Sequence, residues 1–123
     1  MTLLLVMTGG AVGAVLRYLV DRVVVGAGRP SYWGTFAVNV VGAALLGGIA
    51  GTGTALDGPL ARLLATGLCG ALTTYSTFAY EVVQLAGGGA RDRWWAAGYA
   101  AATLTVGFTA LVTAHAMAAA LAR

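Results

Sequence analysis

The chain has little of what most enzymes use to build a catalytic centre. Its 123 residues include one histidine, one cysteine and four acidic side chains. A lone cysteine excludes an intrachain disulfide and a metal–thiolate cluster, so Cys69 is expected to be a small packed side chain. His115 has no carboxylate near it in the sequence, and we expect it to pack or to lie at an interface. We therefore predict that the protein is not an enzyme.

Charged residues are also scarce. They make up 9% of the chain, whereas 59% is hydrophobic, and the mean hydropathy is +0.85. So few polar residues cannot cover a soluble globule, and the composition indicates an integral membrane protein. The net charge of +3 is spread over loops on both sides, and no phosphate-binding glycine loop is present. Nucleic-acid binding is therefore not expected.

Four apolar stretches suit the roughly 20 residues that a membrane-spanning helix needs. The loops between them are short, so we predict one four-helix transmembrane domain over residues 1–123, an all-α membrane protein. The N-terminus lacks the basic start and the cleavage site of a secretory signal, so the first stretch should remain as a span. The predicted spans are residues 3–20, 33–50, 60–86 and 94–121.

The third stretch carries polar residues near its midpoint, Thr73, within residues 67–78 (GLCGALTTYSTF). Glycines weaken a helix, and consecutive hydroxyl side chains compete for its backbone hydrogen bonds. Unwound backbone at membrane depth is tolerated where protein or a watery cavity surrounds it, and its free carbonyls commonly bind a cation. We predict that the third helix is broken near its middle. The alternative is a continuous helix whose threonines bond to the preceding turn.

Size and glycine spacing favour an oligomer. Four helices of this length leave little room to enclose a pore. Gly9 and Gly13 repeat at an interval of four, as do Gly47 and Gly51. Such GxxxG spacings often mark association faces, although they also serve packing inside one subunit.

The basic residues, all arginines, hardly fix an orientation in the membrane. The side of the first and third loops carries Arg22, Arg29, Arg91 and Arg93. The other side carries the amino terminus, Arg62 and Arg123. So small an excess lets the chain insert either way, with a lean toward cytoplasmic first and third loops. An antiparallel pair would supply both leaflets with aromatic anchors, because one subunit carries them on the first side only. These anchors are Tyr18, Tyr32, Trp33, Trp94 and Trp95.

Charged and amide side chains inside the first two spans face neighbouring helices. Arg17 continues the stripe of Gly9 and Gly13, and Asp21 or Glu81 is its expected partner. It would serve either as a structural anchor or as an attraction for ions at a pore mouth. Asn39 shares a face with Thr35 and Gly42 in the second span. Its amide would either tie two helices together or donate to a passing anion.

The fourth span carries two polar stripes. One contains Tyr99, Thr103 and Gly107; the other contains Thr105, Thr109 and Thr113. Either stripe would suit a polar track, but threonine hydroxyls also bond to their own helix.

Three segments resemble the signatures of the Fluc (CrcB) family of small fluoride channels, in matching order and spacing over nearly the whole chain. They are residues 9–18 (GGAVGAVLRY), residues 34–42 (GTFAVNVVG), and residues 67–78 followed by Glu81. Members of that family expel toxic fluoride passively across the bacterial plasma (inner) membrane. The resemblance implies an antiparallel, dual-topology dimer with two pores and a structural sodium ion at its centre.

Position by position, the resemblance implies that the backbone carbonyls of Gly70 and Thr73 from both subunits bind the sodium. Oxygen ligands suit a hard cation, and its charge would favour anions nearby. Arg17 and Glu81 match charged positions near the vestibules, and Gly107 stands where the family often has another hydroxyl. The implied fluoride path contains Asn39, Tyr75, Ser76, Thr77, Phe78, Tyr99 and Thr103.

Tyr75 departs from the family pattern, which usually has phenylalanine at the positions of both Tyr75 and Phe78. Ring edges carry partial positive charge and can meet a small anion without holding it tightly. The extra hydroxyl would hydrogen-bond fluoride or a partner group. A subunit of a heterodimeric channel, paired with a paralogous chain, therefore remains an alternative to a homodimer.

We expect passive permeation of fluoride, with hydrogen-bond donors and ring edges replacing lost water. A small proton-coupled multidrug exporter is a second hypothesis, because such exporters also have four helices and form antiparallel dimers. It needs a carboxylate inside a span, whereas Asp21 and Glu81 lie late in theirs. A third hypothesis is a subunit that only stabilises a partner.

Overall fold

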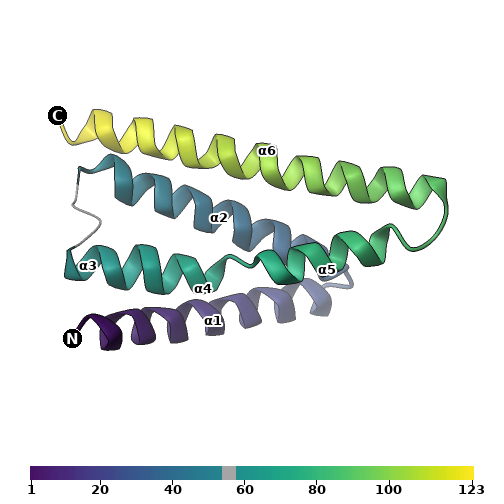
Figure 1. Cartoon of the computed structure of the whole chain (residues 1–123), viewed down its shortest axis with the longest axis horizontal. Helices are drawn as coiled ribbons and strands as arrows, with labels where there is room; N and C mark the ends of the chain where they lie inside the picture. Colours follow the sequence, from purple (N-terminus) through teal and green to yellow (C-terminus); the bar gives the residue numbers. More distant parts are fainter. Residues whose placement is uncertain (54–57) are drawn as a thin grey trace.

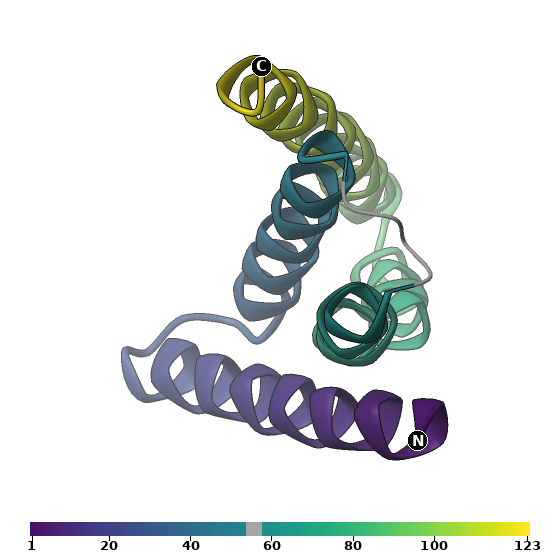
Figure 2. The same cartoon turned by 90° about the vertical axis from the view of Figure 1, so that its left-hand side faces the viewer.

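The computed structural model describes residues 1–53 and 58–123, and every regular element in this part of the chain is a helix. Figure 1 shows α1, α2, α6 and the row from α3 to α5 running along one long axis, and the end-on view in Figure 2 shows that α1, α2 and α6 are inclined to one another. The elements are α1 (Thr2–Gly26), α2 (Tyr32–Gly51), α3 (Pro59–Ala61), the π-helical segment η1 (Arg62–Cys69), α4 (Gly70–Leu72), α5 (Tyr75–Leu85) and α6 (Ala90–Leu121).

Three helices within the described residues are long and apolar enough to cross a membrane: α1, α2 and α6, with 25, 20 and 32 residues. The predicted spans 3–20, 33–50 and 94–121 fall inside them. α1 continues six residues beyond the prediction and ends before Gly28, whose φ of 74° lies in the left-handed region. A glycine adopts this conformation without steric cost, which makes it a common end of a helix.

The third predicted span is broken where its polar run predicts a break. α4 ends at Leu72, Thr73 and Thr74 are extended with ψ of 149° and 117°, and α5 begins at Tyr75. Figure 1 shows this interruption between α4 and α5, about halfway along the molecule. The alternative of a continuous helix is therefore wrong, although the Thr73 hydroxyl does donate to the Cys69 carbonyl at 2.9 Å. The π-helical winding of η1 was not expected from the sequence.

The glycines of the GxxxG spacings pack helices together inside the subunit. A Cβ atom on Gly9 would overlap the carbonyl oxygen of Leu63 in η1, and one on Gly47 would overlap the carbonyl oxygen of Leu111 in α6. Gly13 and Gly51 are enclosed in the same two contacts. These glycines therefore do not mark an association face. The alternative interpretation, packing within one subunit, is confirmed.

The two ends of the molecule differ in the connections that they carry. Both termini, the end of α2 and the start of α3 lie at one end, and the links from α1 to α2 and from α5 to α6 lie at the other (Figure 1). The arginines and aromatic residues assigned to the first and third loops therefore share the second end. Trp94 and Trp95 are exposed there, as anchors at a membrane surface would be.

Candidate functional site

Asn39 of α2 binds the unwound backbone in the third span through two hydrogen bonds to one residue, Thr74. The Thr74 backbone N–H donates to Asn39 Oδ1 at 2.8 Å, and Asn39 Nδ2 donates to the Thr74 carbonyl at 3.3 Å. We call this pair of bonds the Asn39 clasp. It gives both backbone polar groups of this unwound residue a hydrogen-bond partner, which unwound backbone at membrane depth requires. Of the two roles predicted for this amide, the structure contains the tie between helices.

Thr74 caps the second half of the broken span. Its Oγ1 accepts a hydrogen bond from the Thr77 backbone N–H at 3.3 Å and donates to Thr77 Oγ1 at 3.1 Å. The Ser76 hydroxyl lies 3.5 Å from the same oxygen. Thr74 is buried, and it is not among the site residues predicted from the sequence. The signal for it was present, because threonine directly before a helix is a common N-cap residue.

These bonds withdraw two amides from the backbone pattern of a continuous helix, in which the N–H of residue i+4 donates to the carbonyl of residue i. The partner of the Gly70 carbonyl would be the Thr74 N–H, which Asn39 takes. The partner of the Thr73 carbonyl would be the Thr77 N–H, which Thr74 takes. These are the two carbonyls expected to bind a cation, and hard cations prefer such oxygens. Gly70 is exposed, and a Cβ atom there would meet nothing within 4 Å, so it faces away from the subunit.

Glu81 joins three helices through its carboxylate. Thr35 Oγ1 of α2 donates to Oε1 at 2.9 Å, and the Tyr99 hydroxyl of α6 donates to Oε2 at 2.9 Å. Only 8% of Glu81 is exposed, so both oxygens are satisfied inside the protein. Thr35 belongs with the predicted site, and its position four residues before Asn39, on the same face, was the signal for it.

The threonine hydroxyls of α6 donate hydrogen bonds to backbone carbonyls of their own helix. Thr103 Oγ1 donates to the Tyr99 carbonyl at 2.8 Å. Thr105, Thr109 and Thr113 do the same toward the carbonyls four residues earlier, at 2.8, 2.7 and 2.8 Å. The alternative interpretation of the second stripe, bonding within the helix, therefore holds.

A hollow of about 420 Å³ lies beside the Asn39 clasp, between α2, α5 and α6. The rings of Phe78 and Tyr99 approach to 5.7 Å between centroids, and those of Tyr75 and Phe78 to 6.4 Å. Tyr75 is 82% exposed. Residues that line the hollow include Asn39, Thr73, Thr74, Tyr75, Phe78, Thr103, Gly107 and Phe108.

A second, more polar hollow of about 270 Å³ lies between α1, α2 and α5, and Thr74 borders both hollows. Arg17 lines it and is half-buried. Within residues 1–53 and 58–123, its guanidinium has no ion pair or hydrogen bond. Asp21 instead accepts a hydrogen bond from Ser31, and Glu81 is held as described above. The expected pairing of Arg17 with either carboxylate is therefore wrong.

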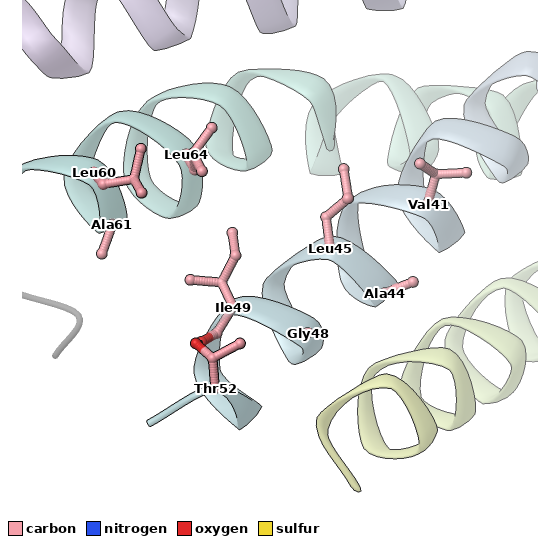
Figure 3. A pocket seen from close by; sticks show the side chains of 9 residues that line it. All are labelled: Val41, Ala44, Leu45, Gly48, Ile49, Thr52, Leu60, Ala61 and Leu64. Atoms are coloured by element: carbon pink, nitrogen blue, oxygen red, sulfur yellow. The ribbon is translucent and has the colours of Figure 1, made fainter. Parts of the chain in front are cut away.

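A third hollow, of about 590 Å³, separates α2 from α3 and η1 (Figure 3). Apart from Thr52, its lining is apolar, with Leu45 and Ile49 of α2 pointing toward α3 and η1. A lining of this kind offers no set of donors for an anion. The polar residues predicted for the site are instead brought together around the break, with Ser76 on the exposed side of α5 and Arg17 in the polar hollow.

The fold and these contacts define a class: a small helical membrane protein with an interrupted span, whose free backbone lies beside polar hollows. Interrupted spans of this kind build ion and substrate sites in channels and transporters. The sequence model of the family described as CrcB-like protein, Camphor Resistance (CrcB), matches residues 4–115. The chain belongs to the CrcB family, which confirms the resemblance found in the sequence.

Relatives of this chain are described as fluoride-specific ion channels. Fluoride-specific ion channel FluC 1 of Frankia casuarinae is 46% identical over 100% of this chain and 97% of its own length. FluC 1 of Streptomyces avermitilis is 48% identical over 89% of this chain and 90% of its own. FluC 2 of Halobacterium salinarum is 43% identical over 94% and 84%. These names describe ion channels and not enzymes.

Proposed function

We propose that the protein is a fluoride-selective channel that lets fluoride leave the cell passively and so lowers its cytoplasmic concentration. The observation that carries this function is the interrupted span held beside two hollows, in a chain that matches a FluC 1 protein over its whole length. We place the channel in the bacterial plasma (inner) membrane. Residues 59–85 would cross the membrane a fourth time, beside the three long helices.

Permeation requires that the channel replace the water that fluoride loses without binding the ion tightly. Side-chain donors at the break would do this: the second N–H of Asn39 Nδ2 and the hydroxyls of Tyr75, Ser76 and Thr77. The ring edges of Tyr75, Phe78 and Tyr99 would add weak positive sites along the hollow. Thr103 would line the hollow without donating a hydrogen bond to fluoride, because its hydroxyl donates to the Tyr99 carbonyl.

The two charged residues have different roles in this proposal. Arg17 has no partner among the described residues, and its guanidinium would draw anions into the polar hollow. Glu81 would act as a structural charge, because hydroxyls from α2 and α6 bind both its oxygens. Narrowness and strong hydrogen-bond acceptance by the smaller halide would separate fluoride from chloride.

We infer a dual-topology, antiparallel dimer as the working assembly. Ser76, Tyr75 and Gly70 are exposed at mid-height of the subunit, where lipid would leave their polar groups unsatisfied. A second copy would cover them and bring four carbonyls together, two each from Gly70 and Thr73, as a structural Na⁺ site. Gathering of the aromatic anchors at one end also favours an antiparallel pair.

The alternative is an obligate subunit of a heterodimer. Relatives named FluC 1 and FluC 2 both occur, which is consistent with paired paralogues. The deciding experiment is efflux from liposomes that contain only this polypeptide, with fluoride compared to chloride and no proton gradient. Selective fluoride efflux supports the homodimer. Efflux that appears only with a paralogous chain supports the heterodimer, and gradient-driven uptake of organic cations would instead support an exporter.

Asn39→Asp tests the proposed route itself. The substitution puts a negative charge beside the hollow, and like charges 4 Å apart repel by roughly 4 kcal/mol at an effective dielectric constant of 20. We expect fluoride efflux to fall by at least about 100-fold, since each 1.4 kcal/mol is tenfold in rate. Liposomes with equal amounts of folded wild-type and variant protein give the measurement. Unchanged efflux would remove Asn39 from the route.

A further inference from the structure

We propose that Asn39 and Thr74 are positioning residues for the central cation. Their side chains accept hydrogen bonds from the two backbone amides that would otherwise donate to the Gly70 and Thr73 carbonyls. The inference rests on the proposed function, which supplies the Na⁺ between subunits. It adds which side chains keep the oxygens available and assigns Asn39 a second task besides facing the anion route.

The first step concerns the Thr74 amide. It has one hydrogen, and the 2.8 Å bond to Asn39 Oδ1 uses it. The return bond from Asn39 Nδ2 to the Thr74 carbonyl fixes the orientation of the side-chain amide. A backbone N–H at membrane depth must find an acceptor. Without Asn39, the Thr74 amide would donate to the Gly70 carbonyl, as in a continuous α-helix. The helix would then extend across the break, and the Gly70 oxygen would no longer be free to bind a cation.

The second step concerns the Thr77 amide, which donates to Thr74 Oγ1. Thr74 is 7% exposed, so no solvent replaces its hydroxyl. Without this cap, the acceptor in line for Thr77 is the Thr73 carbonyl. Each of the two side chains therefore protects one of the two carbonyls.

A third observation concerns Gly42, which shares one face of α2 with Asn39. A Cβ atom on Gly42 would overlap Thr73 Cγ2, so the extended Thr73 lies directly against this glycine. Asn39 lies one turn earlier on the same face. α2 therefore supplies both the acceptor that opens the helix and the space into which the opened residue fits.

The test measures sodium directly through protein stability. Purified full-length protein is melted at increasing Na⁺, with N-methylglucamine keeping ionic strength constant, and the Na⁺ concentration giving half of the rise in unfolding temperature is determined. Loss of a partner that orients a metal ligand typically weakens metal binding 10- to 100-fold. We expect Asn39→Ala and Thr74→Val to raise the half-maximal Na⁺ concentration by at least about tenfold.

Two matched variants control for general damage. Thr74→Ser keeps the capping hydroxyl, and its half-maximal Na⁺ concentration should stay within about twofold of wild type. Asn39→Asp keeps an acceptor for the Thr74 amide, so its Na⁺ requirement should not rise although its fluoride efflux falls. A structural defect alone would not divide the variants in this way.

Equal Na⁺ requirements for Thr74→Val and Thr74→Ser, or a wild-type requirement in Asn39→Ala, would overturn the inference. If Asn39→Ala is not recovered folded, the Thr74 pair decides. A wild-type protein whose melting ignores Na⁺ would refute the sodium site of the proposed function and this inference with it. Absence of fluoride efflux from liposomes that contain only this polypeptide would separately refute the homodimeric channel.

Discussion

The two halves of the broken span are held in place by different means. The first half, η1 and α4, lies against α1 through glycine contacts, in which Gly9 and Gly67 let backbones touch. The second half, α5, is held by side-chain hydrogen bonds, with Glu81 accepting from Thr35 and Tyr99. Lipid gives helices no hydrophobic reason to associate, which leaves close packing and polar bonds as the available forces.

The break lies where these two modes of attachment meet. Thr73 belongs to the packed half through its contact with Gly42, and Thr74 belongs to the bonded half through the Asn39 clasp. The packed half should therefore respond to added volume and tolerate lost polarity. The bonded half should respond to lost hydroxyls and tolerate added volume. Substitutions in the helices that contact each half test this difference.

The largest effect is expected from Gly9→Ala in α1, at the contact that holds the packed half. The added methyl group would overlap the Leu63 carbonyl, which is backbone and cannot rotate away. We expect a destabilisation of about 1 to 3 kcal/mol, seen as a lower unfolding temperature in detergent.

The neighbouring Gly10→Ala is the control for that variant. The nearest atom to its added methyl is the Gly67 carbonyl oxygen at 4.0 Å. Alanine also favours the helix by about 1 kcal/mol over glycine, so this variant should be as stable as wild type or more stable. Equal losses in both variants would contradict glycine packing as the attachment of this half.

An intermediate effect is expected from Thr35→Val in α2 and Tyr99→Phe in α6, the two residues that bond to the bonded half. Each removes one donor to the Glu81 carboxylate, and hydrogen bonds between membrane helices average about 0.6 kcal/mol, up to about 1.7. Because both bonds end on one carboxylate, the double variant should depart from additivity by about 0.5 kcal/mol or more.

The measurement for this pair is a double-mutant cycle on the unfolding free energy, with Thr109→Val as control. Thr109 donates to its own helix on an exposed surface, so its loss should change stability by less than about 0.5 kcal/mol. Strict additivity of Thr35→Val and Tyr99→Phe would mean that Glu81 does not join α2 to α6.

The break itself could be predicted from the sequence because its cause is local. Glycines and adjacent hydroxyls compete with the helix wherever they stand, so Thr73 was identified from residues within a few positions of it. The Asn39 clasp joins residues 35 positions apart, and spacing along α2 left the role of Asn39 open between a tie and an anion donor. The structure contains the tie, and the anion donor remains a proposal.

Charge pairing was the weakest part of the sequence analysis. Asp21 lies one helical turn after Arg17, which made a pair reasonable, but Ser31 at the start of the next helix occupies the carboxylate. Glu81 was reachable only if helix ends met in a particular register, and Thr35 and Tyr99 hold it instead. Such choices among several partners depend on tertiary placement, which spacing does not encode. The glycine stripes were similarly ambiguous, since close packing needs the same residues inside a subunit as between subunits.

The smallest effect is expected from Gly107→Ser in α6, the helix that faces the bonded half, where the glycine has no packing role. A Cβ atom at Gly107 would meet nothing within 4 Å, because the residue borders the 420 Å³ hollow. A serine hydroxyl there would donate to the Thr103 carbonyl, as Thr103 donates to Tyr99. Stability should therefore change by less than about 0.5 kcal/mol, and fluoride efflux by less than about threefold. A loss of stability as large as that of Gly9→Ala would show that Gly107 packs against a neighbouring helix as Gly9 does.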